Sequence, residues 1–162
     1  MPKWPAVRTW LTAHRAWLIV AALLLLVDRA TKVWALTDLA VNGPVVLGKY
    51  LWLNYVENTG MAFGLFQNAN AFLVMIMLAV IGYIIYSWKE IESYGAWARW
   101  GAVLILTGAL GNLYDRLTLG FVVDFIDLRV WPVFNGADSF ITVGAVLLGI
   151  SLLQKKPVAK EK

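Results

Sequence analysis

The chemistry open to this chain must come from carboxylates, amides, hydroxyls or lysines, because it has no cysteine and one histidine. Without cysteine there is no thiolate nucleophile, and His14 has no second histidine with which to hold zinc. Two acidic residues stand out by their surroundings: Asp124 lies within Gly-Phe-Val-Val-Asp-Phe-Ile and Asp138 within Asn-Gly-Ala-Asp-Ser-Phe-Ile. A carboxylate among apolar residues is costly unless it is paired, hydrogen-bonded or protonated, so both are candidates for a functional site.

Two carboxylates held close together cannot both stay ionised, and such a pair shares one proton. One member can then act as general base on a water molecule while the other, protonated, polarises a carbonyl group. Asp124 and Asp138 would thus hydrolyse a peptide bond without a metal or a covalent nucleophile. Asp138 opens an apolar stretch, where a helix dipole favours the charged form, so we expect it to ionise more readily.

Simpler interpretations stay open at this point. Asp138 could be a helix N-cap, in competition with Asn135 or Ser139. Asp124 could pair with Arg116 or Arg129 in a surface loop. The sequence alone cannot show that two residues 14 positions apart meet in space.

The elements that would position these residues are membrane helices. Of the 162 residues, 60% are hydrophobic and only 15% are charged, whereas soluble globular chains are about 45–50% apolar. A membrane-spanning helix needs about 20 mostly apolar residues. We therefore predict a single integral membrane domain over residues 1–162, all-α, with transmembrane helices at about 16–36, 71–88, 97–114 and 137–153. The first has basic residues before it but no small-residue cleavage site after it, so we interpret it as a retained helix.

The distribution of Lys and Arg predicts the orientation, since cytoplasmic flanks carry the excess of positive charge. Four crossings place nine of the fourteen basic residues, including the C-terminal lysines, on the side of the termini, and five on the other. Both termini should therefore be cytoplasmic, and the net charge of +4 indicates topology and contact with anionic lipid, not nucleic-acid binding. Residues 37–70 and 115–136 should face outward. Within the first, residues 45–56 are rich in β-branched and aromatic side chains, with a candidate turn at Gly48-Lys49, and predict a small sheet at the membrane surface.

Polar residues near the outward helix ends suggest structural support. Asp28 and Lys32 are spaced i, i+4 on one helix face, a spacing suited to an ion pair. Gly108 and Gly111 are small enough for close helix packing. Asn112, beside them, would need a buried partner.

Five segments together resemble the conserved boxes of lipoprotein signal peptidases (signal peptidase II, the prolipoprotein signal peptidase family). Their order and spacing agree with that family from about residue 16 to residue 153. The segments are Asp28-Arg29-Ala30-Thr31-Lys32, Asn58-Thr59-Gly60-Met61-Ala62-Phe63-Gly64, Gly108-Ala109-Leu110-Gly111-Asn112-Leu113-Tyr114-Asp115-Arg116, Gly120-Phe121-Val122-Val123-Asp124-Phe125 and Phe134-Asn135-Gly136-Ala137-Asp138-Ser139.

The resemblance implies a multi-pass aspartyl endopeptidase of the bacterial cytoplasmic membrane, with its site near the extracytoplasmic face. Its substrates would be prolipoproteins bearing a diacylglyceryl group on the Cys just after the cleavage site, embedded among membrane lipids. The family uses no metal or other cofactor and is inhibited by the cyclic peptide globomycin. Its outward segments form a β-cradle and a short helix, which we expect at residues 45–56 and 60–70.

The resemblance also assigns residue roles by motif position. Asp124 and Asp138 would be the catalytic dyad, and Asp28, Lys32 and Asp115 would be structural supports. The residues that would bind substrate or brace the site are Asn58, Gly60, Asn112, Arg116, Asn135 and Ala137.

Three rival interpretations fit less well. A small transporter or proton pathway would place carboxylates near mid-bilayer, whereas these cluster at one interface. An unrelated intramembrane aspartyl protease would carry a Gly-x-Gly-Asp box, which is absent. A purely structural scaffold would not need Asn112, Asp124 and Asp138 together.

Overall fold

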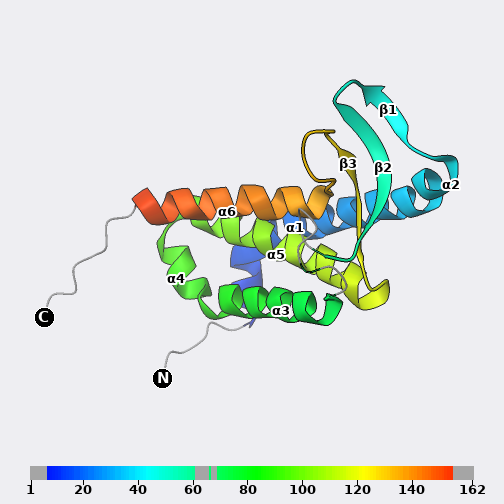
Figure 1. Cartoon of the computed structure of the whole chain (residues 1–162). Coiled ribbons are helices and arrows are strands. Elements are labelled where there is room, and N and C mark those ends of the chain that lie inside the picture. The colour runs from blue at the N-terminus through cyan, green and yellow to red at the C-terminus, as the bar shows by residue number, and fades with distance from the viewer. Residues whose placement is uncertain (1–6, 61–65, 67–68, 155–162) are drawn as a thin grey trace, which may run out of the picture.

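The computed structural model describes residues 7–60, 66 and 69–154, and consists mostly of helices with one small sheet (Figure 1). The helices are α1 (Val7–Trp34), continued by a π-helical segment (Ala35–Leu39) and α2 (Ala40–Asn42), then α3 (Asn70–Tyr86), α4 (Trp88–Ser93), α5 (Ala96–Thr118) and α6 (Gly136–Gln154). The strands are β1 (Val45–Gly48), β2 (Leu51–Asn58) and β3 (Val122–Asp127). The expected short helix at 60–70 falls largely on residues 61–65 and 67–68, which lie outside the described residues.

Helix α5 is the central helix of the bundle and packs against α1, α3 and α6. Glycines make its contact with α6 unusually close: a Cβ atom added to Gly101 would meet the backbone of Gly144, and one added to Gly108 would meet the carbonyl oxygen of Ala137. Backbone-to-backbone contact of this kind is typical of helices that pack through small residues.

Two of the helices extend beyond the ranges expected from hydropathy, whereas α3 ends at Tyr86, before the expected end at 88. The first expected range ends at residue 36, but the helical path continues to Asn42 because Ala35 and Leu39 pack against Val123 and Phe125 of the sheet. The third expected range ends at residue 114, but α5 continues to Thr118. Its polar residues Asp115 and Arg116 are buried with partners, so the helix does not need to end where the apolar run ends.

Among the described residues, one helix is both long and apolar enough to cross a membrane, namely α6 (Gly136–Gln154). The 17-residue helix α3 (Asn70–Tyr86) is apolar but shorter.

The sheet is antiparallel in the order β1-β2-β3 and stands across one end of the helices (Figure 1). Our expectation placed the whole sheet between the first two long helices. That is incomplete, because β3 comes from the segment between α5 and α6. The tight hairpin turn is Lys49-Tyr50, one residue later than expected. The missed strand does have a sequence signal, since Phe121 to Ile126 is rich in β-branched and aromatic residues.

Strand β3 is the one that carries Asp124. The register pairs Val56 with Asp124 and Asn58 with Val122, so Asn58 lies diagonally next to Asp124 on the same face of the sheet. Gly120, at φ 86°, allows the sharp reversal from α5 into this strand. Tertiary pairing with β2 thus fixes where the Asp124 carboxylate points.

Candidate active site

Asp124 and Asp138 come from different elements and meet around one side chain, Asn135. The Asn135 amide nitrogen Nδ2 donates to Asp124 Oδ1 at 2.7 Å. The Asn135 backbone N–H donates to Asp138 Oδ2 at 3.1 Å. Both carboxylates are therefore within hydrogen-bonding reach of the same residue, although β3 and α6 are separate elements.

Asp138 lies in the first turn of α6 and helps to begin that helix. Its backbone N–H donates to Asn135 Oδ1 at 3.0 Å, while its carboxylate accepts from the Asn135 backbone. This reciprocal arrangement is a capping box, in which Asn135 is the N-cap and Asp138 the third helical residue. The N-cap interpretation of Asp138 is therefore wrong in detail, since Asn135 holds that position and Asp138 completes the box.

Each of the four carboxylate oxygens of the pair accepts one hydrogen bond. Asp124 Oδ2 accepts from Asn58 Nδ2 at 2.8 Å, and Asp138 Oδ1 accepts from Asn112 Nδ2 at 2.7 Å. With the two bonds from Asn135, every donor to the pair is an amide N–H, and neither aspartate has an ion pair with a lysine or arginine in the described structure. The alternative pairing of Asp124 with Arg129 is wrong, because Arg129 Nη1 binds Asp127 Oδ2 at 3.0 Å.

Burial raises the pKa of Asp124 to about 7, and the negative charge of Asp138 adds to the increase. Hydrogen bonds from Asn58 and Asn135, and the positive charge of Lys32, oppose that increase. A carboxyl group with a pKa near 7 can take up and release a proton at neutral pH, as a general acid or base must.

A buried ion network lies beneath the two aspartates, on the side of α1. The Lys32 ammonium is 3.1 Å from Asp28 Oδ2, 3.0 Å from Asp115 Oδ2 and 2.8 Å from Asn112 Oδ1. Arg29 Nη1 adds a bond of 2.5 Å to Asp115 Oδ1. Lys32 and Asp115 are both fully buried. We call Asp28, Arg29, Lys32 and Asp115 the Lys32 cluster.

The Lys32 cluster also holds α6 and β3 in place. Asp28 Oδ1 accepts from the backbone N–H of Ala137 at 3.0 Å, so a carboxylate of α1 caps the first turn of α6. Asp115 Oδ2 accepts from the backbone N–H of Val123 at 3.3 Å, next to Asp124. Ala137 is fully buried, and a side chain larger than methyl would meet α5, where Gly108 and Gly111 approach it.

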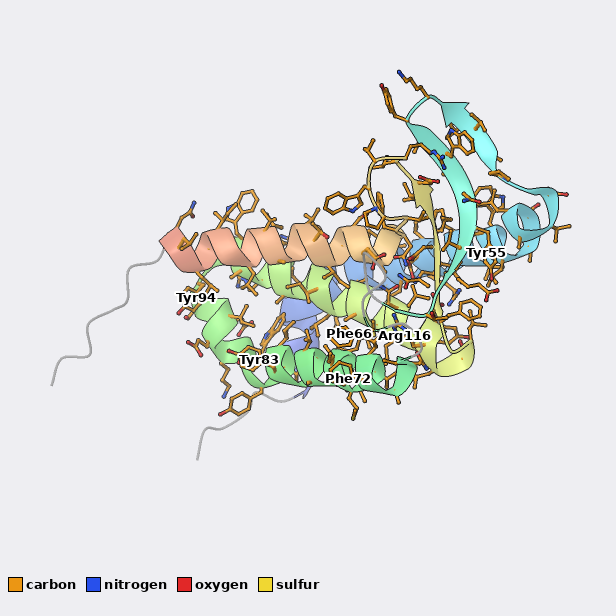
Figure 2. The ribbon with its side chains drawn as sticks, viewed as in Figure 1. Tyr55, Phe66, Phe72, Tyr83, Tyr94 and Arg116 are labelled. Atoms are coloured by element: carbon orange, nitrogen blue, oxygen red, sulfur yellow. The ribbon has the colours of Figure 1, made fainter. Side chains whose placement is uncertain are left out.

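Arg116, labelled in Figure 2, lies in the last turn of α5, near the end of β2 and the start of α3. Its Nη2 donates to the carbonyl oxygen of Gly60 at 2.5 Å, and its Nη1 to Asn70 Oδ1 at 3.3 Å. Asn70 in turn donates to the Arg116 carbonyl oxygen at 3.1 Å. Gly60 itself is held by Asn58, whose Oδ1 accepts from the Gly60 N–H at 3.0 Å.

Two residues of this site were missed from the sequence, namely Arg29 and Asn70. Arg29 lies inside the first motif segment, but the sequence predicts no role for it there. Asn70 directly precedes the apolar run that starts at Ala71, a position where asparagine is common at a helix start. Its contact with Arg116 links residues 46 positions apart, and no local pattern reports such a contact.

Across the described part of the chain, no group of three or more His, Asp or Glu residues is arranged to hold a metal ion.

The sequence matches known signal peptidases, and the fold matches that of a bacterial membrane enzyme. A family model described as signal peptidase (SPase) II matches residues 20–154. A lipoprotein signal peptidase of Thermodesulfovibrio yellowstonii is 43% identical over 139 residues, covering 82% of this chain and 91% of that protein. One of Clostridioides difficile is 42% identical over 142 residues, covering 85% and 94%. The solved structure of a bacterial membrane enzyme superposes with a TM-score of 0.81 at 30% identity, covering 91% of this chain and 93% of the other.

The architecture is thus that of a bacterial membrane enzyme, with a helical bundle that supports a small antiparallel sheet. The chain belongs to the signal peptidase II family, and is a protease of that kind.

Proposed function

We propose that this chain is an aspartyl endopeptidase that removes the signal peptide from diacylglyceryl-modified prolipoproteins, cutting on the N-terminal side of the lipidated Cys. Family membership and the names of its relatives support the substrate class. The observation that supports the mechanism is the meeting of Asp124 and Asp138 around Asn135, with every carboxylate oxygen bonded to an uncharged amide.

The dyad shares one proton when the substrate arrives. The ionised carboxylate takes a proton from a water molecule, and the water oxygen attacks the scissile carbonyl carbon. The protonated carboxyl group donates its proton to the carbonyl oxygen, so no free oxyanion forms. Collapse of the tetrahedral intermediate breaks the C–N bond: the amine of the lipidated Cys takes a proton from one carboxyl group of the dyad, and a hydroxyl of the intermediate returns a proton to the other, so the dyad again holds one proton.

The residues around the dyad hold it and the substrate in place. Asn58, Asn112 and Asn135 orient the two carboxylates through their amide groups. Gly60, Arg116 and Ala137 line or brace the site, and globomycin-type cyclic peptides would compete with substrate there. Asp28, Lys32 and Asp115 support it from α1 and α5.

The four long helices would span the bacterial cytoplasmic membrane, with both termini cytoplasmic and the dyad near the extracytoplasmic face. Large apolar side chains are exposed along them, including Leu26, Met75, Val146 and Leu153. Exposed apolar surface on this scale suits contact with lipid. A diacylglyceryl substrate in the bilayer would then enter sideways between helices, with its scissile bond at the depth where water reaches the dyad.

Cleavage of a diacylglyceryl-modified prolipoprotein by purified enzyme in detergent, with a chelator present, tests the mechanism. Asp124→Asn and Asp138→Asn should each reduce kcat at least about 10⁴-fold, as losses of essential catalytic groups do. Asp127→Asn is the matched control, because Asp127 is a buried aspartate of the same strand that pairs with Arg129. Activity in either dyad variant, or equal loss in all three, would contradict the assignment.

A further inference from the structure

Lys32 is a buried cation that the proposed mechanism does not use. Its side chain is fully buried, and its three N–H donors are matched by three acceptors, Asp28 Oδ2, Asp115 Oδ2 and Asn112 Oδ1. Two of these acceptors are carboxylates, whose two negative charges are balanced by Lys32 and Arg29 together. The third is the carboxamide that bonds to the dyad.

The carboxamide of Asn112 can face the dyad in two ways, and only one of them supplies a donor. Its Oδ1 accepts from Lys32 at 2.8 Å and from Asn135 Nδ2 at 3.2 Å, which occupies both lone pairs. Its Nδ2 donates to Asp138 Oδ1 at 2.7 Å. If the amide were flipped, its NH₂ group would face an ammonium group that can only donate.

The same direction of hydrogen bonding, from amide nitrogen to oxygen, leads through Asn135 to Asp124. Asn135 Nδ2 donates to Asn112 Oδ1 at 3.2 Å, to the Val123 carbonyl oxygen at 3.3 Å and to Asp124 Oδ1 at 2.7 Å, so Asn112 is one of three acceptors that direct this amide nitrogen to the dyad. Asn135 Oδ1 is left to accept from the Asp138 backbone. The Lys32 ammonium group thus favours one direction of hydrogen bonds through Asn112 to Asp138, and through Asn112 and Asn135 to Asp124, where Val123 O and the Asp138 N–H act in the same sense.

We propose that Lys32 is a positioning residue for the dyad, which fixes the orientation of Asn112 and, through it, of Asn135. This inference rests on the proposed function of Asp124 and Asp138. The side chain of Asn112 separates Lys32 from Asp138. The positive charge of Lys32 therefore favours ionisation of the dyad from a distance. A direct ion pair, by contrast, would keep one aspartate permanently charged. Structural support, the role expected from the sequence, is then only part of what this lysine does.

The charged groups around the dyad come from two other elements, α1 and α5, as well as from its own strand and helix. They are Asp28, Arg29 and Lys32 of α1, Asp115 and Arg116 of α5, Asp124 of β3 and Asp138 of α6. The two cations and two anions of the Lys32 cluster balance. Removal of the Lys32 charge leaves one net negative charge beneath the dyad, which makes loss of a proton from either aspartate harder.

Two substitutions separate orientation from charge in the full-length enzyme. Lys32→Met keeps the length of the side chain but removes both its donors and its charge, whereas Lys32→Gln keeps an N–H donor without the charge. Arg99→Met is the matched control, since it removes a cation in the first turn of α5, about 20 Å from Asn112 at 1.5 Å per residue. For each variant, kcat and KM are measured from pH 5 to 9 on a diacylglyceryl prolipoprotein, together with thermal unfolding.

We expect Lys32→Met to lower kcat about 100-fold with little change in KM, as misplacement of catalytic groups does. Lys32→Gln should recover part of that loss. In both variants the pH profile should move to higher pH by about one unit, because a nearby cation no longer favours the charged carboxylates. Arg99→Met should behave as the parent.

A merely structural Lys32 would change the unfolding temperature but not kcat per folded enzyme or the pH profile. That result, or failure of both Lys32 variants to fold, would overturn the inference. Asp124→Asn and Asp138→Asn in the same assay keep the two proposals apart. Activity in those variants refutes the dyad, whereas inactive dyad variants beside parental Lys32 variants refute only the positioning role.

Discussion

At the scale of single residues, the site depends on burial of acidic groups whose partners are mostly amides. Asp124 illustrates the free-energy cost of burying a carboxylate. Its carboxyl group is buried and accepts hydrogen bonds from Asn58 and Asn135, and its pKa nevertheless rises to about 7. Burial favours the neutral acid, and two amide donors do not fully replace the lost hydration of the carboxylate. The reactivity proposed for this residue therefore comes at the expense of stability.

This cost predicts how stability depends on pH. In the folded protein Asp124 holds its proton up to about pH 7, whereas in the unfolded chain it releases it near the ordinary value of 3.8. The folded state therefore binds the proton more tightly, and its stability falls as pH rises from about 4 to 7. Between pH 5 and pH 8 we expect a loss of about 3 kcal/mol from this group.

Thermal unfolding of the parent and of Asp124→Asn at pH 5 and pH 8 measures this effect. The parent should unfold several degrees lower at pH 8, since 1 kcal/mol corresponds to about 2–4 °C in a chain of this size. Asp124→Asn cannot ionise and should show a much smaller difference. An equal pH dependence in both proteins would place the titrating group elsewhere.

At the scale of elements, the position of Asp138 depends on how closely α6 approaches α5. A Cβ atom added to Gly144 would lie within 3.0 Å of Gly101 O, Ile105 N and Ile105 Cγ1. Two of those three atoms belong to the backbone, so the helices themselves would have to move apart. The same two helices carry Asn112 and Asp138, whose side chains bond to each other at 2.7 Å.

Gly144→Ala should therefore destabilise the protein by about 1–3 kcal/mol, the usual cost of overpacking. Gly149→Ala is the matched control in the same helix, because a Cβ atom there meets nothing within 4 Å. That substitution should be neutral or stabilise by up to about 1 kcal/mol through helix propensity. Equal unfolding temperatures for the two variants would show that the α5–α6 contact is not tight.

At the scale of the whole molecule, the buried charged groups gather at one end of the bundle. One apolar cluster of Ile84, Ile91, Ala98, Ala102 and Ile105 joins α3, α4 and α5 near Tyr94, whereas Arg116 and Tyr55 mark the other end, where the sheet stands (Figure 2). The ion networks and both aspartates lie at the sheet end. This arrangement suits an enzyme whose active site lies at one membrane interface.

The proposed topology predicts which residues are accessible from outside the cell. The chain has no cysteine, so single cysteines introduced by Lys49→Cys and Glu90→Cys report only their own positions. Lys49 lies in the turn between β1 and β2, and Glu90 lies in α4. A membrane-impermeant maleimide should label position 49 in intact spheroplasts, and position 90 only after the membrane is permeabilised.

Labelling of both positions in intact spheroplasts, or of position 90 alone, would contradict the orientation. Retained cleavage activity in each variant serves as the control that the protein is correctly inserted.

The sequence by itself determined the helical class, the β1–β2 hairpin and the family. The helices and the hairpin follow from hydropathy and β-propensity, which are local properties of a run of residues, and the family follows from the five motif segments. The spacing of Asp28 and Lys32 likewise predicted their ion pair, since both residues lie on one helix face. Motif resemblance supplied Asp124 and Asp138 as candidates, but no pattern in the residues could show that they meet.

Only the tertiary structure decided how the site is assembled, because its contacts join residues that are far apart in the chain. Strand β3 extends the sheet only through pairing with β2, and this pairing brings Asn58 to Asp124 across 66 positions. Asp28 caps α6 across 109 positions, and Lys32 reaches Asn112 across 80. A buried lysine or carboxylate is stable only beside its partners. Packing of the elements determines which residues become those partners, and this packing cannot be read from the order of the residues.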